Sequence, residues 1–439
     1  MLALDTAPVI QVAQPAWRLA TRVAFRFCST YFVLYVITTQ MLGGLIVLPG
    51  VDLPDLGSLP PVRTIVSWVA VHGFRVSYPL VISGSGSGDK TFDWVHAFVI
   101  LVLAAAATGV WSFIQRRSGD HARPQTWFHL FLRFALGSTM VVYGSVKVVP
   151  LQMSAPSLTR LLEPYGNFSP MGVLWASVGA SRPYEIAIGG AELAGGILLF
   201  FPRTALLGAV ICLIDTIQIF LLNMTYDVPV KLFSFHLILM SLVLLAPEGR
   251  RLLNVLLLNR RAEPSPDRPI GNSPRARRLA VIAQIVFGLY LVGMNLNTAR
   301  QSWTQYGGGA PKSALYGVWT VERMSIDGVI RSPLVTDYDR WRRVLFDRPT
   351  FVSFQRMDDT FAGYGARIDE AGKSIALTKP ADKNWSASYT FARPAADRLI
   401  LDGTMDGHTL HMELQLFDRS KFLLISGGFH WIQEYPFNR

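Results

Sequence analysis

Several stretches of this chain are long enough and apolar enough to cross a lipid bilayer, and this feature limits the fold most. A helix needs about 20 mainly apolar residues to span the hydrocarbon core, where only its own backbone can satisfy its polar groups. Of the 439 residues, 51% are hydrophobic and only 16% are charged, which is unusual for a soluble protein. The sequence therefore predicts a polytopic α-helical membrane protein with about seven transmembrane helices. The expected spans are about 22–48, 94–115, 127–149, 184–201, 204–223, 230–246 and 278–299.

Arginines cluster in alternate loops between these spans, which predicts the orientation of the chain. The clusters comprise Arg18, Arg22, Arg26, Arg116, Arg117, Arg123, Arg203, Arg250, Arg251, Arg260, Arg261, Arg268, Arg275, Arg277 and Arg278. Because loops rich in Lys and Arg stay in the cytoplasm, the N-terminus is expected inside and, after seven crossings, the C-terminal domain outside. We expect a multi-pass protein of the plasma (inner) membrane of a bacterium.

The net charge of +11 comes entirely from residues 1–314, because residues 315–439 are balanced in charge. Juxtamembrane arginines suit anionic lipid headgroups. The expected partners are thus membrane lipids, with subunits of a membrane complex as an open alternative and no nucleic acid.

No cofactor can be assigned from the sequence. The two cysteines, Cys28 and Cys212, both lie in expected spans, so one chain offers no CxxC pair or thiolate zinc site. The histidines of the spans are expected at different depths, which argues against paired haem ligands. The run SGSGSGDKT at 83–91 departs from a phosphate loop, and we expect Asp89 or Thr91 to cap the second span instead. We find no haem, nucleotide or metal motif, while a quinone stays open.

Four regions follow from these patterns: residues 1–126 with two spans and an outside loop, 127–247 with four spans, 248–314 with a cytoplasmic linker and the seventh span, and 315–439. Within the first region, residues 60–82 are broken by Arg63, His72 and Arg75. We expect an interfacial or re-entrant helix there, not an eighth span.

From residue 315 onward apolar residues alternate with polar ones, which predicts an all-β antiparallel domain. Ten runs have this period, at 316–323, 341–346, 350–356, 361–368, 374–379, 385–391, 398–403, 408–417, 421–427 and 429–435. Asp-Gly turns at Asp327-Gly328 and Asp406-Gly407 separate some of them and favour hairpins. Eight to ten strands suit an up-and-down barrel. The opening Gly317-Val318-Trp319 resembles the Gly-x-Trp of lipocalin-like barrels.

Two of the expected spans each concentrate small and charged residues on one helix face. In the third span this face carries Arg133, Gly137, Gly144 and Lys147, together with Met140, and in the fourth it carries Glu185, Gly189, Glu192 and Gly196. Glycines on such a face allow neighbouring helices to approach closely. With the later run ELAGGILLFFPRTALLGAV, this pattern resembles the DoxX-like membrane family over about residues 127–247. The resemblance implies a four-helix bundle and a link to membrane redox or sulfur metabolism.

Six polar residues of the bundle are expected in the outer half of the bilayer: Lys147, Glu185, Glu192, Asp215, Gln218 and His236. Ionisable residues inside spans are costly and usually mark function. We expect Asp215 and Glu192 to face each other and line a polar cavity open to the outside. The alternative is structural: Lys147 pairs with Glu185, and the buried acids are protonated and hydrogen-bonded.

In the β domain, the runs RSPLVTDYDRWRR at 331–343 and GGFHWIQEYPFNR at 427–439 are rich in arginine and aromatic residues. They indicate either ordinary barrel packing or an aromatic-lined binding mouth, with a packed chain end and a paired Arg439.

Three functions remain open. The first is a membrane protein that handles a hydrophobic or lipid-like ligand, as an accessory subunit of a membrane complex. The second is a DoxX-like oxidoreductase component that uses quinone. The third is a proton- or ion-coupled transporter that uses Glu192 and Asp215. Catalytic residues cannot be named from the sequence, so enzymatic activity stays open.

Overall fold

The computed structural model of the chain describes residues 17–51, 53–115, 122–264, 270–379 and 381–438. Its contacts divide the chain into two compact units, which we describe separately. The first comprises Met1–Ser145 and Gly190–Asn295, and the second comprises Val146–Gly189 and Leu296–Arg439. Four arginines used in the sequence analysis, Arg116, Arg117, Arg268 and Arg439, lie outside the described residues.

Six helices in the described part of the chain are long and apolar enough to cross a membrane, so this is a multi-span membrane protein. They are Leu19–Thr38 (α1), Thr91–Ile114 (α4), Arg182–Phe200 (α8), Ala205–Thr225 (α9), Lys231–Leu256, and Pro274–Gln305 (α12). A further long helix, α5 (Ala122–Val148), covers the third expected span. It is not one of the six, and His129 and Arg133 make it more polar than its neighbours.

Shorter helices connect these long ones. In the first unit they are α2 (Met41–Leu45), η1 (Leu56–Ser58) and α3 (Pro60–His72); Lys231–Leu256 consists of α10 (Lys231–Leu245), η3 (Ala246–Glu248) and α11 (Gly249–Leu256). In the second they are α6 (Leu158–Leu162), η2 (Tyr165–Asn167) and α7 (Pro170–Gly179). With 13 residues, α3 is too short to cross a bilayer. The first expected span is also shorter than predicted, since α1 ends at Thr38 and α2 follows.

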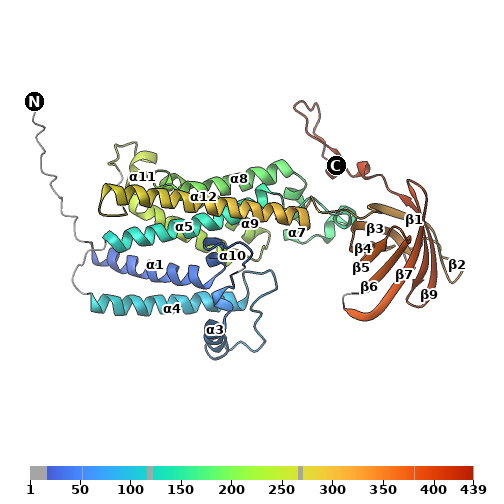
Figure 1. Ribbon diagram of the computed structural model, residues 1–439, viewed down its shortest axis with the longest axis horizontal. Coiled ribbons are helices and arrows are strands. Elements are labelled where there is room, and N and C mark those ends of the chain that lie inside the picture. Colours follow the sequence, from blue (N-terminus) through green and yellow to red (C-terminus); the bar gives the residue numbers. More distant parts are fainter. Residues whose placement is uncertain (1–16, 52, 116–121, 265–269, 380, 439) are drawn as a thin grey trace, which may run out of the picture. The chain divides into compact units, whose positions relative to one another are not determined.

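Glycines bring the helices of the first unit into close contact, as their spacing predicted. A Cβ added to Gly196 on α8 would lie 2.7 Å from the carbonyl oxygen of Gly137 on α5. One added to Gly208 on α9 would lie 2.8 Å from the backbone nitrogen of Leu199. Figure 1 shows α5, α8 and α9 running beside one another in this unit. Their backbones are close enough that only glycine fits at these crossings.

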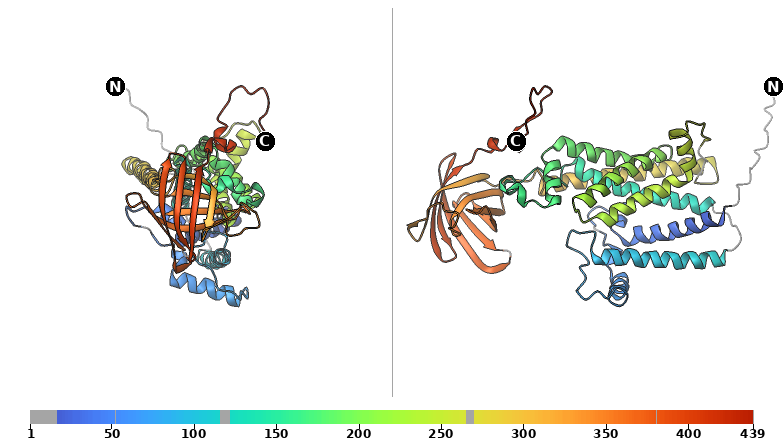
Figure 2. Two further views of the ribbon diagram at one scale, coloured as in Figure 1. Left: turned by 90° about the vertical axis from the view of Figure 1, so that its right-hand side faces the viewer. Right: turned by 180° about the vertical axis from the view of Figure 1, so that it is seen from behind.

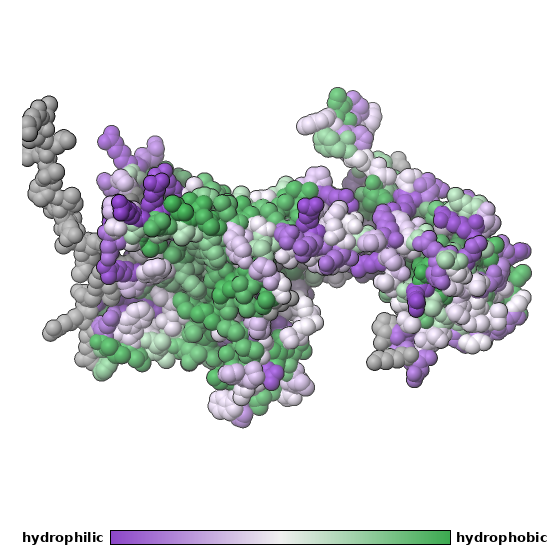
Figure 3. Space-filling model, viewed as in Figure 1, coloured by the Kyte–Doolittle hydropathy of each residue, from purple (hydrophilic) through white to green (hydrophobic). Residues whose placement is uncertain are grey.

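The outside of the helical unit is apolar. Leu279, Ile282, Val286 and Leu289 on α12 are each about half exposed or more. Figure 3 shows this hydrophobic surface in green over the helices. Such a surface is typical of helices that face lipid, because the solvent outside is as apolar as the core inside.

Asp89 caps a different helix from the one that the sequence predicted. Its two carboxylate oxygens accept hydrogen bonds from the backbone N–H groups of Lys231 and Leu232, both at 2.8 Å, at the start of α10. Asp93 instead accepts from the backbone of Lys90 at 3.0 Å, within the capping box of α4. The loop before α4 thus holds the start of a helix 142 residues later in the chain, which no local pattern could reveal.

The second unit contains a closed antiparallel β-barrel, as predicted. Its strands are β1 (Gly317–Ile326), β2 (Val329–Ile330), β3 (Trp341–Arg348), β4 (Phe351–Arg356), β5 (Phe361–Asp369), β6 (Ser374–Lys379), β7 (Asp382–Ala395), β8 (Arg398–Met405) and β9 (His408–Leu416). Strands β1 and β3 to β9 follow one another around the barrel, which closes where β1 pairs with β9. Figure 2 shows the strands of the barrel from two further directions. The short β2 pairs with β1 alone.

The two Asp-Gly turns have the backbone that the sequence predicted. Asp327, Gly328, Asp406 and Gly407 all have positive φ angles, between 51° and 82°. Two successive residues with positive φ form the turn that matches the twist of an antiparallel hairpin. These turns set the β1–β2 and β8–β9 registers and thus place both aspartates at the same end of the barrel.

The last two of the ten expected strands are wrong. Residues 419–426 form η4 (Arg419–Lys421) and α13 (Leu423–Ser426), and residues 427–438 contain no strand. The expected packed chain end is also wrong, because Trp431 is 91% exposed and Tyr435 85% exposed. The physical reason is closure: once β9 pairs with β1, that edge is no longer available for another strand.

The connection between α5 and α8 packs against the barrel, which the sequence did not predict. Leu158 on α6 is buried with Val318 and Leu345 of β1 and β3. Its backbone N–H also donates to the carboxylate of Asp347 at 3.3 Å. Part of the region assigned to the four-helix bundle therefore belongs to the same compact unit as the barrel.

Candidate functional site

Glu192 and Asp215 lie in the helical unit near the same thiol. Glu192 on α8 is 3% exposed, and the Oδ2 atom of Asp215 on α9 is buried. Both carboxylates act electrostatically on Cys212, one turn before Asp215. The geometry is thus in keeping with a common polar site, but the shared cavity remains a prediction.

Gln218 and His236 have different surroundings from Glu192 and Asp215. Gln218 is exposed on α9. His236 on α10 is buried, and its Nε2 accepts from the hydroxyl of Tyr31 at 2.7 Å while its Nδ1 donates to the Leu232 carbonyl at 2.7 Å. The ring of Tyr35 stacks on it at 3.9 Å. With both nitrogens and one face engaged, His236 has a structural environment.

Lys147 and Glu185 both belong to the second unit and are both buried. Glu185 Oε1 accepts from the backbone N–H of Met153 at 2.9 Å. The positive charges of Lys147 and Arg182 act on the Glu185 carboxylate. This environment favours the structural alternative for Glu185, which holds the chain just after α5.

Arg133, on the same predicted face as Lys147, binds the end of a helix. Its Nε and a terminal nitrogen both donate to the carbonyl oxygen of Leu199, at 2.9 and 2.7 Å. The last carbonyls of a helix have no partner within the helix, so this arginine satisfies one near the end of α8.

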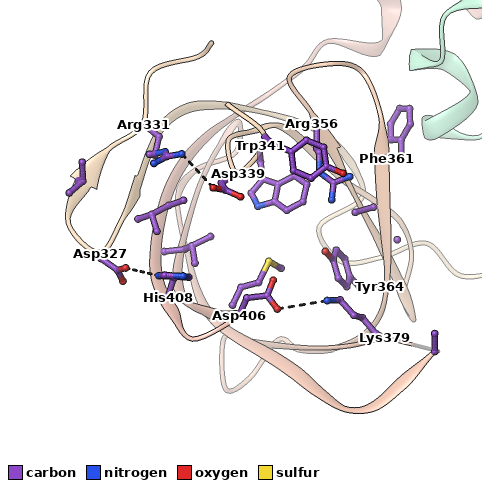
Figure 4. A pocket seen from close by; sticks show the side chains of 18 residues that line it. Asp327, Arg331, Asp339, Trp341, Arg356, Phe361, Tyr364, Lys379, Asp406 and His408 are labelled. Atoms are coloured by element: carbon purple, nitrogen blue, oxygen red, sulfur yellow. Dashed lines mark hydrogen bonds and ion pairs between the residues drawn. The ribbon is translucent and has the colours of Figure 1, made fainter. Parts of the chain in front are cut away.

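The barrel has an open mouth with a cavity of about 910 Å³. It lies at the end where β4 and β6 finish and β5 and β9 begin, whereas β1 starts at the other end of the barrel. Its apolar and aromatic lining includes Ile326, Val329, Tyr338, Trp341, Phe361, Tyr364, Met405 and Leu410. Its charged lining includes Asp327, Arg331, Asp339, Arg356, Lys379, Asp406 and His408, all of which Figure 4 labels.

Below the mouth the barrel is filled by side chains. Trp319, Met324, Val344, Leu399 and Met412 are completely buried in its core. Such a core leaves no channel, so a ligand could occupy the mouth and not the length of the barrel.

Aromatic rings form a connected wall on one side of the mouth. Trp341 and Tyr364 each contact Phe354, with ring centroids 5.1 and 5.5 Å apart, and Trp385 stacks on Tyr364 at 5.0 Å. Burial raises the pKa of Tyr364, so its phenol stays neutral at physiological pH. Of these rings, Trp341 and Tyr364 line the cavity and offer flat apolar surfaces to a ligand.

Ion pairs fix several charged residues of the rim. Arg331 donates to Asp337 at 2.8 and 2.6 Å, and this bond holds the pKa of the Asp337 carboxyl below its ordinary value. His408 Nδ1 lies 2.7 Å from Asp327, lowering the pKa of Asp327 and raising that of His408. These contacts hold the loops around the opening.

Arg340 supports the rim from inside. Only 1% exposed, it donates to the carbonyl oxygens of Val321, Arg331 and Trp341. Burial lowers the pKa of this arginine, and the three carbonyls compensate part of the cost of burying its charge.

The sequence analysis found part of this site. Its run 331–343 supplies Arg331, Tyr338, Asp339 and Trp341, whereas the described residues of the other run, 427–438, are absent from the lining. It missed Arg356, Tyr364 and Lys379, which come from three successive strands. The order of the strands could have indicated these residues, because in an antiparallel meander the end of one strand and the start of the next lie at the same end of the barrel.

Comparison with known proteins identifies one relationship. The chain is 34% identical to the uncharacterized protein YwoB of Bacillus subtilis over 143 residues, which are 33% of this chain and 86% of that protein. The chain belongs to the YwoB family. No family model matches the chain, and no solved structure matches it. In the described part of the chain, no group of three or more His, Cys, Asp or Glu residues could hold a metal ion.

Proposed function

We propose that this membrane protein binds a hydrophobic or lipid-like ligand in the mouth of its β-barrel. The observation that carries the proposal is the cavity of about 910 Å³ with its aromatic wall. Ligand sites of this size are typically lined by apolar and aromatic residues with a few polar groups. A protein anchored by several membrane helices meets lipids constantly, so membrane lipids are the partners that we propose.

We further propose the orientation in which the barrel lies outside the plasma (inner) membrane of a bacterium and the N-terminus inside. It requires α5 to cross the membrane as a seventh span. The close approach of Gly137 to Gly196 supports this, because it packs α5 along α8. Protease added to intact spheroplasts should then remove the barrel, and protection there would contradict this topology.

Residues 127–247 are, in this proposal, a bundle of the DoxX-like kind, and the barrel resembles lipocalin-like barrels. Supporting features are the glycine contacts between α5, α8 and α9 and the buried Trp319, whose indole N–H donates to the Leu315 carbonyl at 2.8 Å. A role as an accessory subunit of a membrane complex fits a domain that binds a ligand beside a membrane.

The test is an inventory of molecules that copurify with the full chain in phosphatidylcholine nanodiscs. Lipid or another amphiphile should be retained beyond the amount in empty nanodiscs. Val329→Glu should weaken this retention, because it places a charge against the apolar lining of the mouth. Val335→Glu is the matched control, since Val335 is 68% exposed and does not line the mouth, whereas Val329 is 65% exposed and does.

Equal retention by both variants, or none by the unaltered chain, would contradict the proposal. Recovery of quinone as the retained molecule would instead favour the oxidoreductase component.

A further inference from the structure

We infer that the mouth selects anionic amphiphiles and that Arg356 binds their acidic head group. The inference rests on the proposed function and adds to it the chemical class of the ligand: an apolar chain that ends in a carboxylate or a phosphate. The observation behind this inference is the position of the Arg356 guanidinium among the residues that line the mouth.

Arg356 stands at the end of β4 and lines the cavity. Its guanidinium lies over the rings of Tyr338 and Trp341, 4.2 and 5.2 Å from their centroids. Its Nε atom is buried and has no hydrogen-bond partner. Among the described residues, no carboxylate forms an ion pair with this side chain. Asp358 is within electrostatic range, but its Oδ1 accepts from the hydroxyl and backbone N–H of Thr360.

The other cations of the mouth are paired, which sets Arg356 apart. Arg331 contacts the carboxylates of Asp337 and Asp339. Lys379 lies 3.7 Å from Asp406 and also over the ring of Trp385. Arg356 is therefore the cation of the described lining that stacks on aromatic rings and forms no ion pair. Partial burial of a charge that forms no ion pair costs free energy, and an anion bound from outside would recover part of it.

The two aromatic rings also orient the guanidinium. Stacking on Tyr338 and Trp341 restricts the plane of the side chain, so less entropy is lost when its donors bind a ligand. An oriented guanidinium matches the two oxygens of a carboxylate or phosphate with two parallel hydrogen bonds. Figure 4 shows Arg356 and Trp341 together at the edge of the opening.

The rest of the mouth suits an apolar chain. Phe361, Tyr364, Met405 and Leu410 line the same cavity as Arg356. Because the barrel core below is filled, the chain would lie across the mouth and not along the barrel axis. A free inorganic anion would use Arg356 but leave this apolar lining exposed to water, so the joint arrangement favours an amphiphile.

The test compares the binding of ligands with the same alkyl chain length to the full-length protein in phosphatidylcholine nanodiscs. Empty nanodiscs give the baseline. Dansyl-undecanoic acid serves as the fluorescent probe, and decanoate, decyl phosphate, decanol and inorganic phosphate compete for it. Decanoate and decyl phosphate should compete at least about tenfold more strongly than decanol, because charge-assisted hydrogen bonds contribute more than neutral ones. Inorganic phosphate should compete weakly.

Arg356→Gln should weaken the binding of decanoate and decyl phosphate about tenfold, because it removes the charge-assisted hydrogen bonds. The binding of decanol should be unchanged, which would also show that the mouth has folded. Arg356→Lys should retain part of the preference, since it keeps the charge but not the parallel donors. Arg323→Gln, a highly exposed arginine on β1 outside the mouth, is the matched control and should change nothing.

The outcomes separate the two proposals. Equal binding of decanoate and decanol, unaffected by Arg356→Gln, would overturn the anionic head group and leave the hydrophobic ligand in place. Binding of inorganic phosphate as strongly as decyl phosphate would overturn the amphiphile, since it would assign Arg356 to a free anion. Failure of every amphiphile to bind would overturn the proposed function itself.

Discussion

In the barrel, large apolar side chains point inward and polar ones outward, whereas α12 exposes apolar residues along most of its length. The barrel core is made of residues such as Trp319 and Phe346, at most 1% exposed. The helical unit holds its members together with glycines and buried polar contacts, such as that between Tyr31 and His236. The contrast follows from the surroundings: water drives apolar groups into the barrel, but a lipid-like exterior gives helices no such drive.

The largest expected effect is therefore the loss of a core side chain from the barrel. Trp319→Ala should lower the free energy of unfolding by about 3–5 kcal/mol, because it leaves a cavity and removes the hydrogen bond to Leu315. Limited proteolysis of the full chain should show faster cleavage within 315–439. Val286→Ala, which truncates a 60% exposed side chain on α12, should have little effect. Equal sensitivity of the two positions would break the contrast between the units.

A smaller effect is expected where helices touch through glycine. Gly196→Ala should cost about 1–3 kcal/mol, because its Cβ would lie 2.7 Å from the Gly137 carbonyl and push α5 from α8. Gly190→Ala on the same helix has nothing within 4 Å of its Cβ and should be tolerated. Denaturant titration of both variants in detergent compares them directly. An equal loss of stability in Gly190→Ala would mean that the effect at Gly196 does not come from close packing of α8 against α5.

The sequence predicted those features that follow from a regular spacing of residues along one helix or strand. Eight of the expected strands and the glycine contact between Gly137 and Gly196 follow from such patterns. The failures involve long-range events. The alternation at 429–435 could not show that β9 would already have closed the barrel against β1.

The candidate site was predicted less completely than the fold. Tyr338 and Trp341 lie in the run 331–343, which the sequence analysis identified by its arginines and aromatic residues. Nothing in the sequence distinguishes Arg356 from other arginines at strand ends, and only the folded barrel places it over these two rings. His236 illustrates how little depth in the membrane says about the contacts of a side chain. Its depth in the membrane suggested a polar cavity, but only the fold revealed that Tyr31 and Tyr35 on α1 occupy its surroundings.

The hydrogen bond between Tyr31 and His236 is a polar contact inside an apolar helix pair, and we expect a modest effect there. Tyr31→Phe should cost about 1 kcal/mol or less, since buried hydrogen bonds between membrane helices contribute little on average. The measurement is the same denaturant titration, with Tyr290→Phe as control, whose hydroxyl donates to a backbone carbonyl from an exposed residue. A loss of several kcal/mol would assign His236 a larger role in holding α1 to α10.

The smallest effect is expected at the barrel surface, where His408 faces Asp327, Asp339 and Asp406. The pKa of His408 is raised, so its stabilising contribution is complete below its ordinary value near 6.5 and disappears as the pH rises through the folded value. The pKa of Asp327 is lowered, so its contribution is present above about 3.8 and is lost as the pH falls through its folded value. His408→Gln should therefore lower the melting temperature of the barrel most near pH 5.5 and hardly at all near pH 9. Calorimetry of the full chain at both pH values measures this difference. A larger loss at pH 9 than at pH 5.5 would show that His408 stabilises the rim as a neutral hydrogen-bonding group and not as a cation.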